Sequence, residues 1–177
     1  MIRLAAVVAL TATGVGCYDS EVPLDKAPQA SIDRALVGAW RSLPFGSGGD
    51  AEATTLTVGR ETDQVYSITL REGQTEAERY EAYASLVKGT TLLNVKDLDP
   101  RRPASPWTLA RYSLLLPDVL HVQVVGKKLL RGVERSPPAI RQALERLSER
   151  RELYQDLMVC VRVPQGPRKG GDGTVPH

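Results

Sequence analysis

Histidine and cysteine are scarce in this chain, with two residues of each type among 177. Two cysteines cannot form a disulfide framework, and the residues contain no His or Cys cluster at metal-ligand spacing. Cys160 lies in an apolar run, so we expect a buried, inert thiol there. His121 alternates with apolar neighbours on a predicted strand and His177 ends the chain. We therefore expect no catalytic residues, no metal and no cofactor.

The chain also lacks a charge bias and a long hydrophobic run. Lys and Arg number 23 against 21 Asp and Glu, which argues against a nucleic-acid partner. The apolar stretch near the N-terminus, residues 4–15, falls short of the roughly 20 residues that a membrane-spanning helix needs. Arg3 precedes this stretch and small residues follow it, an arrangement typical of a secretory signal peptide.

The end of this signal, Gly14-Val15-Gly16-Cys17, resembles the lipobox of bacterial lipoproteins. The resemblance implies cleavage before Cys17, a thioether-linked lipid on its sulfur, an acylated amino terminus and a protein held to the cell envelope by these chains. An ordinary signal peptide with an incidental Cys17 is the alternative. Asp does not directly follow the cysteine, which by the same resemblance favours the outer membrane, facing the periplasm, over the inner membrane.

Composition divides the rest of the chain into three parts. Residues 17–31 contain two prolines, mixed charges and few large apolar side chains, so we expect a flexible tether after the lipidated cysteine. Residues 165–177 are rich in Gly and Pro and are expected to be a disordered tail. The folded domain is predicted over residues 32–164, behind a signal peptide of residues 1–16.

Short runs with β-like alternation recur at even spacing through this domain, and one amphipathic helix interrupts them. Residues 138–154 form the helix, because Ile140, Ala143, Leu144, Leu147 and Tyr154 fall on one stripe. Ser136 and Pro137 mark its start. The eight predicted strands are residues 36–43, 54–58, 64–71, 79–87, 90–98, 106–116, 119–125 and 157–163.

This order predicts a mainly β fold, either an antiparallel barrel or an open curled sheet, with one helix before the last strand. Gly38-Ala39-Trp40 in the first strand resembles the Gly-x-Trp of lipocalins and related calycin barrels. The resemblance implies that Trp40 plugs the closed end of a barrel and that an arginine from a late strand lies over it. Arg162 and Arg111 are the candidates for that arginine.

Five aromatic residues occur on successive predicted strands: Tyr66, Tyr80, Tyr83, Trp107 and Tyr112. These side chains could line a cavity for an apolar ligand, or they could fill a solid core as in small barrels.

Together these features lead us to expect a lipid-anchored envelope lipoprotein without enzymatic activity that binds a small apolar ligand or an envelope protein. The alternative is a periplasmic inhibitor of a hydrolase, a protease or lysozyme, acting through a protruding loop at residues 44–50 or 99–105.

Overall fold

The structure, a computed structural model, describes residues 17–43, 53–103 and 105–164. The predicted signal peptide, the predicted tail and the loop at residues 44–50 lie outside these described residues.

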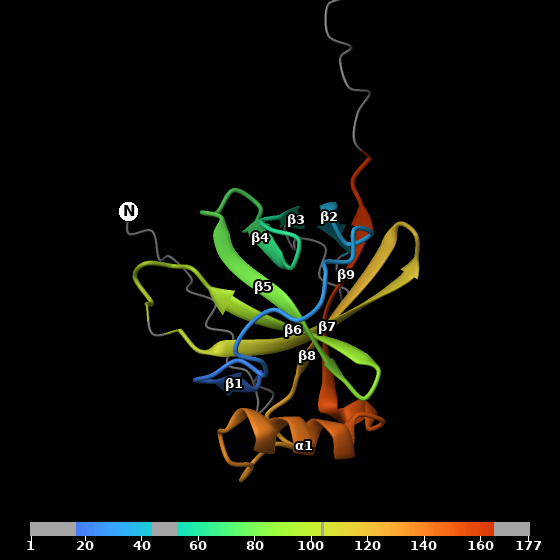
Figure 1. The fold of residues 1–177 in the computed structure, drawn as a ribbon. Helices are drawn as coiled ribbons and strands as arrows, with labels where there is room; N and C mark the ends of the chain where they lie inside the picture. The colour runs from blue at the N-terminus through green and yellow to red at the C-terminus, as the bar shows by residue number, and fades with distance from the viewer. Residues whose placement is uncertain (1–16, 44–52, 104, 165–177) are drawn as a thin grey trace, which may run out of the picture.

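Eight antiparallel strands close into a barrel (Figure 1). The closure is made by the last strand, which pairs with the first through Trp40 and Arg162. This confirms the predicted mainly β class and the closed form over the open sheet, and the barrel is consistent with a lipocalin-like fold. The strands are β2 (Gly38–Ser42), β3 (Thr54–Arg60), β4 (Val65–Glu72), β5 (Glu78–Val87), β6 (Thr90–Asp97), β7 (Trp107–Leu116), β8 (Val119–Val125) and β9 (Tyr154–Arg162).

Alternating side chains divide the buried residues between two cores. Ala110 and Val124 belong to the core inside the barrel. Their chain neighbours Leu109 and Val125 belong to a second core, which lies between the outer face of the sheet and the helix. The barrel is therefore packed on both sides of β7 and β8, which explains why these strands carry apolar residues at successive positions.

Trp40 closes one end of the barrel. Its side chain is fully buried, its indole nitrogen donates to the Leu36 carbonyl at 2.9 Å, and the Arg162 guanidinium lies 4.0 Å from the ring centroid. Arg162 also donates to the carbonyl oxygens of Ala35 and Val37. Gly38 has a φ of 147°, and a Cβ there would lie 2.6 Å from the Arg162 guanidinium. Glycine is favoured at position 38 because residues with a side chain rarely adopt this φ, and the nearby guanidinium leaves little room for a Cβ.

The helix α1 (Pro137–Leu147) is shorter than predicted. It packs on the outer core through Ile140, Ala143 and Leu144. The apolar stripe predicted a helix as far as Tyr154. After α1 the chain instead forms a short 3-10 helix, η1 (Arg151–Leu153), and then enters β9. Tyr154 pairs with Val125 of β8, and this ladder requires an extended backbone at a position where the apolar spacing alone favoured a helix.

Residues 17–31 are not a free tether, so this prediction was wrong. The strand β1 (Asp19–Ser20) pairs with the start of β7, and the Tyr18 amide donates to the Val125 carbonyl at 2.7 Å. Leu24 is buried, and its amide donates to the side chain of Asn94 at 2.7 Å. The folded unit therefore includes residues 17–31, and this segment runs across the outside of the barrel before it enters β2 (Figure 1).

Candidate functional site

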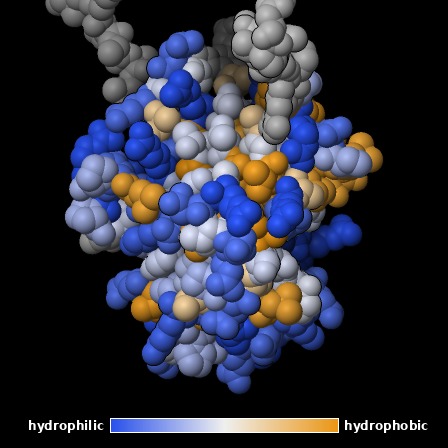
Figure 2. All heavy atoms as spheres, turned by 45° about the horizontal axis from the view of Figure 1, so that its top comes forward, coloured by the Kyte–Doolittle hydropathy of each residue, from blue (hydrophilic) through white to orange (hydrophobic). Residues whose placement is uncertain are grey.

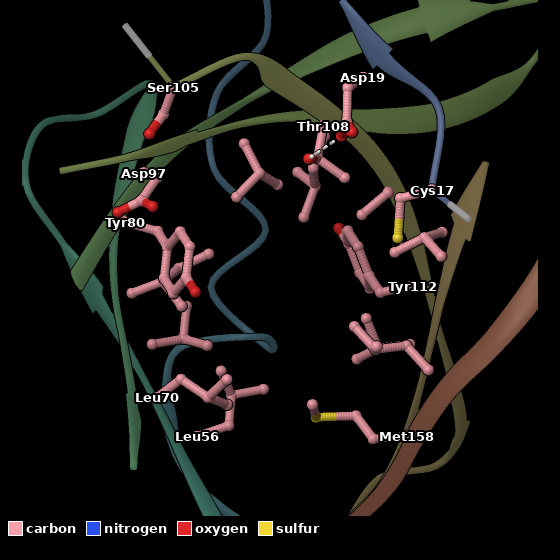
Figure 3. Close-up of a pocket in the computed structure, with 18 of the residues that line it drawn as sticks. Cys17, Asp19, Leu56, Leu70, Tyr80, Asp97, Ser105, Thr108, Tyr112 and Met158 are labelled. Carbon is pink, nitrogen blue, oxygen red and sulfur yellow. Dashed lines mark hydrogen bonds between the residues drawn. The ribbon is translucent and has the colours of Figure 1, made fainter. Parts of the chain in front are cut away.

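The barrel contains a cavity of about 520 Å³. It reaches from Leu36 and Leu120, near the end closed by Trp40, to polar side chains at the far end. Figure 3 shows side chains from strands all around the barrel pointing toward its centre. The barrel is thus packed solid at one end and hollow at the other. Its apolar lining is formed by Leu36, Leu56, Val58, Ile68, Leu70, Leu93, Val95, Pro106, Ala110, Leu120, Val122, Val124, Leu157 and Met158.

Charged side chains lie at the mouth of the cavity. The Arg102 guanidinium contacts the Asp97 carboxylate at 3.0 Å, and both side chains belong to the lining. The second oxygen of Asp97 accepts from the Asp99 amide at 2.9 Å. Asp19 accepts from the Thr108 hydroxyl at 3.2 Å on another side of the mouth (Figure 3). The mouth therefore presents two carboxylates and one guanidinium around an apolar interior.

Of the five aromatic residues that could line a cavity or fill a core, two line the cavity, Tyr80 and Tyr112. The Tyr80 hydroxyl donates to Glu78 at 2.6 Å, and burial together with this carboxylate raises the pKa of Tyr80. The Tyr112 hydroxyl donates to Asp33 at 3.1 Å, and burial is again the main reason why its pKa is raised. Both phenols remain protonated and hydrogen-bonded to carboxylates, so they supply ring surface to the cavity.

The other three aromatic residues lie elsewhere. Tyr66 is buried inside the barrel, where its hydroxyl accepts from the Asp33 amide at 2.6 Å, and it does not line the cavity. Tyr83 and Trp107 lie on the outer face, with ring centroids 5.7 Å apart, and the Tyr83 hydroxyl donates to the Asp25 carbonyl. Tyr83 and Trp107 neither line the cavity nor fill the inner core, because Ala84 and Thr108, their neighbours in the chain, face inward instead.

Arg111 is not the arginine that covers Trp40. It lies on the outer face, 3.5 Å from the centroid of the Tyr154 ring, and its Nε donates to the Gln123 side chain at 2.6 Å. Arg162 is the arginine that the structure brings onto Trp40. The strand register decides between the two, because Arg162 is the direct cross-strand partner of Trp40.

Cys17 is the residue whose position the sequence does not suggest. It pairs with Gly126 at the end of β8 and its sulfur belongs to the cavity lining (Figure 3). Burial, and next the charge of Asp19, raise the pKa of its thiol, so the thiolate is scarce at neutral pH. Alternation of apolar residues along β6 and β8 indicates in the sequence which of their side chains line the cavity. No such pattern indicates the position of Cys17, because its pairing with Gly126 joins residues that are distant in the chain.

Within the described residues, no group of three or more His, Cys, Asp and Glu side chains is arranged to hold a metal ion. No helix in the same part of the chain is long and apolar enough to cross a membrane. Comparisons with protein-family models, with curated proteins and with solved structures find no match to this chain.

Proposed function

We propose that this protein is a lipid-anchored, non-enzymatic envelope lipoprotein whose barrel binds a small, elongated apolar ligand. The observation that carries the proposal is the cavity. Its volume of about 520 Å³ lies within the range of about 300 to 1,000 Å³ of small-molecule sites, and its lining is mostly apolar with a few polar groups at one end. An acyl chain with a small polar head matches this arrangement.

The hydrogen bonding of the lining supports binding rather than catalysis. Asp97 is held by Arg102 and by a backbone amide, and the two tyrosine hydroxyls donate to carboxylates of the protein. A general acid or base needs a polar atom free to reach the substrate. The principal polar groups of the cavity are already engaged with protein neighbours, so they serve to shape the site.

The outer surface supports the cavity as the binding site. On the face that Figure 2 shows, hydrophobic residues lie in several separate groups among hydrophilic ones. A surface that docks a protein partner more often presents one large contiguous apolar patch. Compared with this face, the interior of the barrel offers the more continuous apolar surface for a ligand.

Anchoring at Cys17 would hold the mouth of the barrel at the membrane. Cys17 is itself part of the barrel wall, so no free linker separates the lipid from the cavity. The acyl chains together anchor firmly, since each buried methylene adds about 0.8 kcal/mol. An apolar ligand dissolved in the bilayer would then reach the cavity without crossing water.

Lipidation is tested by replacing Cys17 with Ser, followed by cell fractionation and intact mass measurement of the wild-type chain and the variant. We expect the wild type to be membrane-bound and heavier by the mass of its lipid, and the variant to be released. A variant that stays in the membrane with no loss of lipid mass would refute the anchor.

Ligand binding is tested by titrating the protein with a fluorescent fatty-acyl probe. Val95→Phe narrows the cavity and should weaken binding by about tenfold or more, equivalent to at least about 1.4 kcal/mol. Thr57→Phe adds the same side chain at an exposed position of β3 and should leave the affinity unchanged. Equal affinities in the two variants would place the probe outside the barrel.

One observation favours a second function, inhibition of a hydrolase. The loop between β6 and β7 is braced by Asp99, which accepts from the Arg101 amide at 2.9 Å and contacts the Arg102 side chain at 3.3 Å. An ordered loop of this kind suits an inhibitor. Recovery of an envelope protease or lysozyme with the tagged protein, lost on Asp99→Ala, would support this function over ligand binding.

A further inference from the structure

The sulfur of Cys17 opens into the cavity. Cys17 is half-buried, and its side chain points toward the same interior as Tyr112 and Met158 (Figure 3). Any group joined to this sulfur starts at the wall of the apolar cavity, between the polar mouth and the apolar interior.

The backbone at Cys17 has little freedom to move this sulfur away. Cys17 pairs with Gly126, whose amide donates to the Leu153 carbonyl at 2.8 Å. Tyr18 is buried in the outer core, and Ser20, in β1, is buried beside β7. Contacts within the barrel and the outer core thus hold the chain on the C-terminal side of the cysteine.

We propose that in the lipidated protein one acyl chain of the lipid on Cys17 lies in the barrel cavity of the same molecule. The inference rests on the proposed lipid anchor and names the first occupant of the proposed ligand site. The cavity has room for one acyl chain, so the other chains remain in the bilayer.

Occupation by its own lipid makes ligand binding competitive. A chain attached at the cavity wall has an effective concentration in the millimolar range, as for other short linkers. A free single-chain ligand binds only when it displaces this chain into the bilayer. The lipidated protein should therefore bind a free ligand at least about tenfold more weakly than the unlipidated protein.

The test attaches alkyl chains of graded length to the Cys17 thiol. The full chain is made by cell-free translation without membranes, which leaves the thiol free, and it is treated with methyl, octyl, dodecyl or hexadecyl methanethiosulfonate at mildly alkaline pH. Binding of a fluorescent fatty-acyl probe and the thermal midpoint are then measured for each adduct. Cys17→Ser, treated in the same way, reports any reaction at Cys160.

A matched control moves the attachment point. In the Cys17→Ser chain, Ser31→Cys provides a thiol at an exposed position of the segment before β2. The amide of the next residue, Ile32, donates to the Asp63 carbonyl in the turn between β3 and β4. A hexadecyl chain there cannot enter the mouth, so it should change neither probe affinity nor thermal midpoint.

We expect the dodecyl and hexadecyl adducts of Cys17 to weaken probe binding at least about tenfold and to raise the thermal midpoint by about 5 °C or more relative to the methyl adduct. Equal midpoints for methyl and hexadecyl adducts would overturn the inference. If the unmodified chain does not bind the probe and the midpoint still rises with chain length, the inference holds and the free-ligand function fails. Absence of lipid from the cellular protein refutes the anchor, and with it this occupant.

Discussion

Removal of the Trp40 side chain should be the most damaging single change in the barrel. The indole is fully buried against the inner core, its nitrogen is hydrogen-bonded to Leu36, and it lies beneath the Arg162 guanidinium. Trp→Ala in a core costs about 3 to 5 kcal/mol through lost burial and the cavity left behind. Domains of this size are stable by about 5 to 15 kcal/mol, so Trp40→Ala would remove a large share of the stability.

Part of this loss of stability comes from the contact between Trp40 and Arg162 rather than from burial of the tryptophan alone. A cation–π contact contributes about 0.5 to 2 kcal/mol, and Arg162 is about one quarter exposed, which places the value in the lower half of that range. The exposed Asp118 carboxylate, 3.3 Å from the Arg162 Nε, adds little because solvent screens it. Arg162→Ala should therefore cost less than Trp40→Ala, and the two effects should not add.

Urea unfolding of the wild type, both single variants and the double variant measures this coupling as a double-mutant cycle. Gly38→Ala should also destabilise the barrel, because a φ of 147° is rarely adopted by residues with a side chain and the added Cβ would lie 2.6 Å from the guanidinium. We expect a coupling of about 0.5 to 1.5 kcal/mol between Trp40 and Arg162. A loss below about 1 kcal/mol for Trp40→Ala, or strict additivity, would refute the assignment of this pair as the closure of the barrel.

Three further predictions concern stability. Leu144→Ala should cost about 2 to 5 kcal/mol and Arg146→Ala less than about 0.5, and equal urea midpoints would mean that α1 faces the other way. Asn94→Ala should cost about 1 to 3 kcal/mol because it leaves the Leu24 amide unpaired, and unchanged stability would refute docking of the N-terminal segment. Burial raises the pKa of Cys160 to about 11 from 9.0, so its contribution to stability is lost as pH rises from about 9 to 11, and Cys160→Ala should flatten that decline in chemical denaturation.

The alternation of apolar and polar side chains in the sequence is sufficient to predict most strands of the fold. Tyr66, Ile68 and Leu70 share one side of β4, as predicted, and this side faces the interior of the barrel. Tyr66 is opposite Ala82 in the register, and both are fully or nearly fully buried, so a large side chain meets a small one across the strands. Local pattern thus identified strands and their inner faces, because period-two alternation is a property of the strand itself.

The misplaced residues depend on pairings between distant parts of the chain. Residues 17–31 read as a tether because they contain few large apolar side chains. Leu24 and Tyr18 nevertheless become buried, because α1 and the outer face of the sheet together provide an apolar groove for them. The composition of a segment shows how much apolar surface it contains. It does not show whether a distant part of the chain provides an apolar surface against which that segment can pack.

The hollow end of the barrel follows from the placing of the largest side chains. Trp40 and Tyr66 both lie toward one end, where Leu36 and the segment before β2 cover them. Toward the mouth the inward positions carry Val95, Ile68 and Leu70, whose shorter side chains leave the centre open. The two interpretations of the aromatic residues therefore each apply in part: Tyr66 fills the inner core, whereas Tyr80 and Tyr112 line the cavity. Because Cys17 belongs to the cavity lining, the proposed attachment point of the lipid and the proposed ligand site meet at one place.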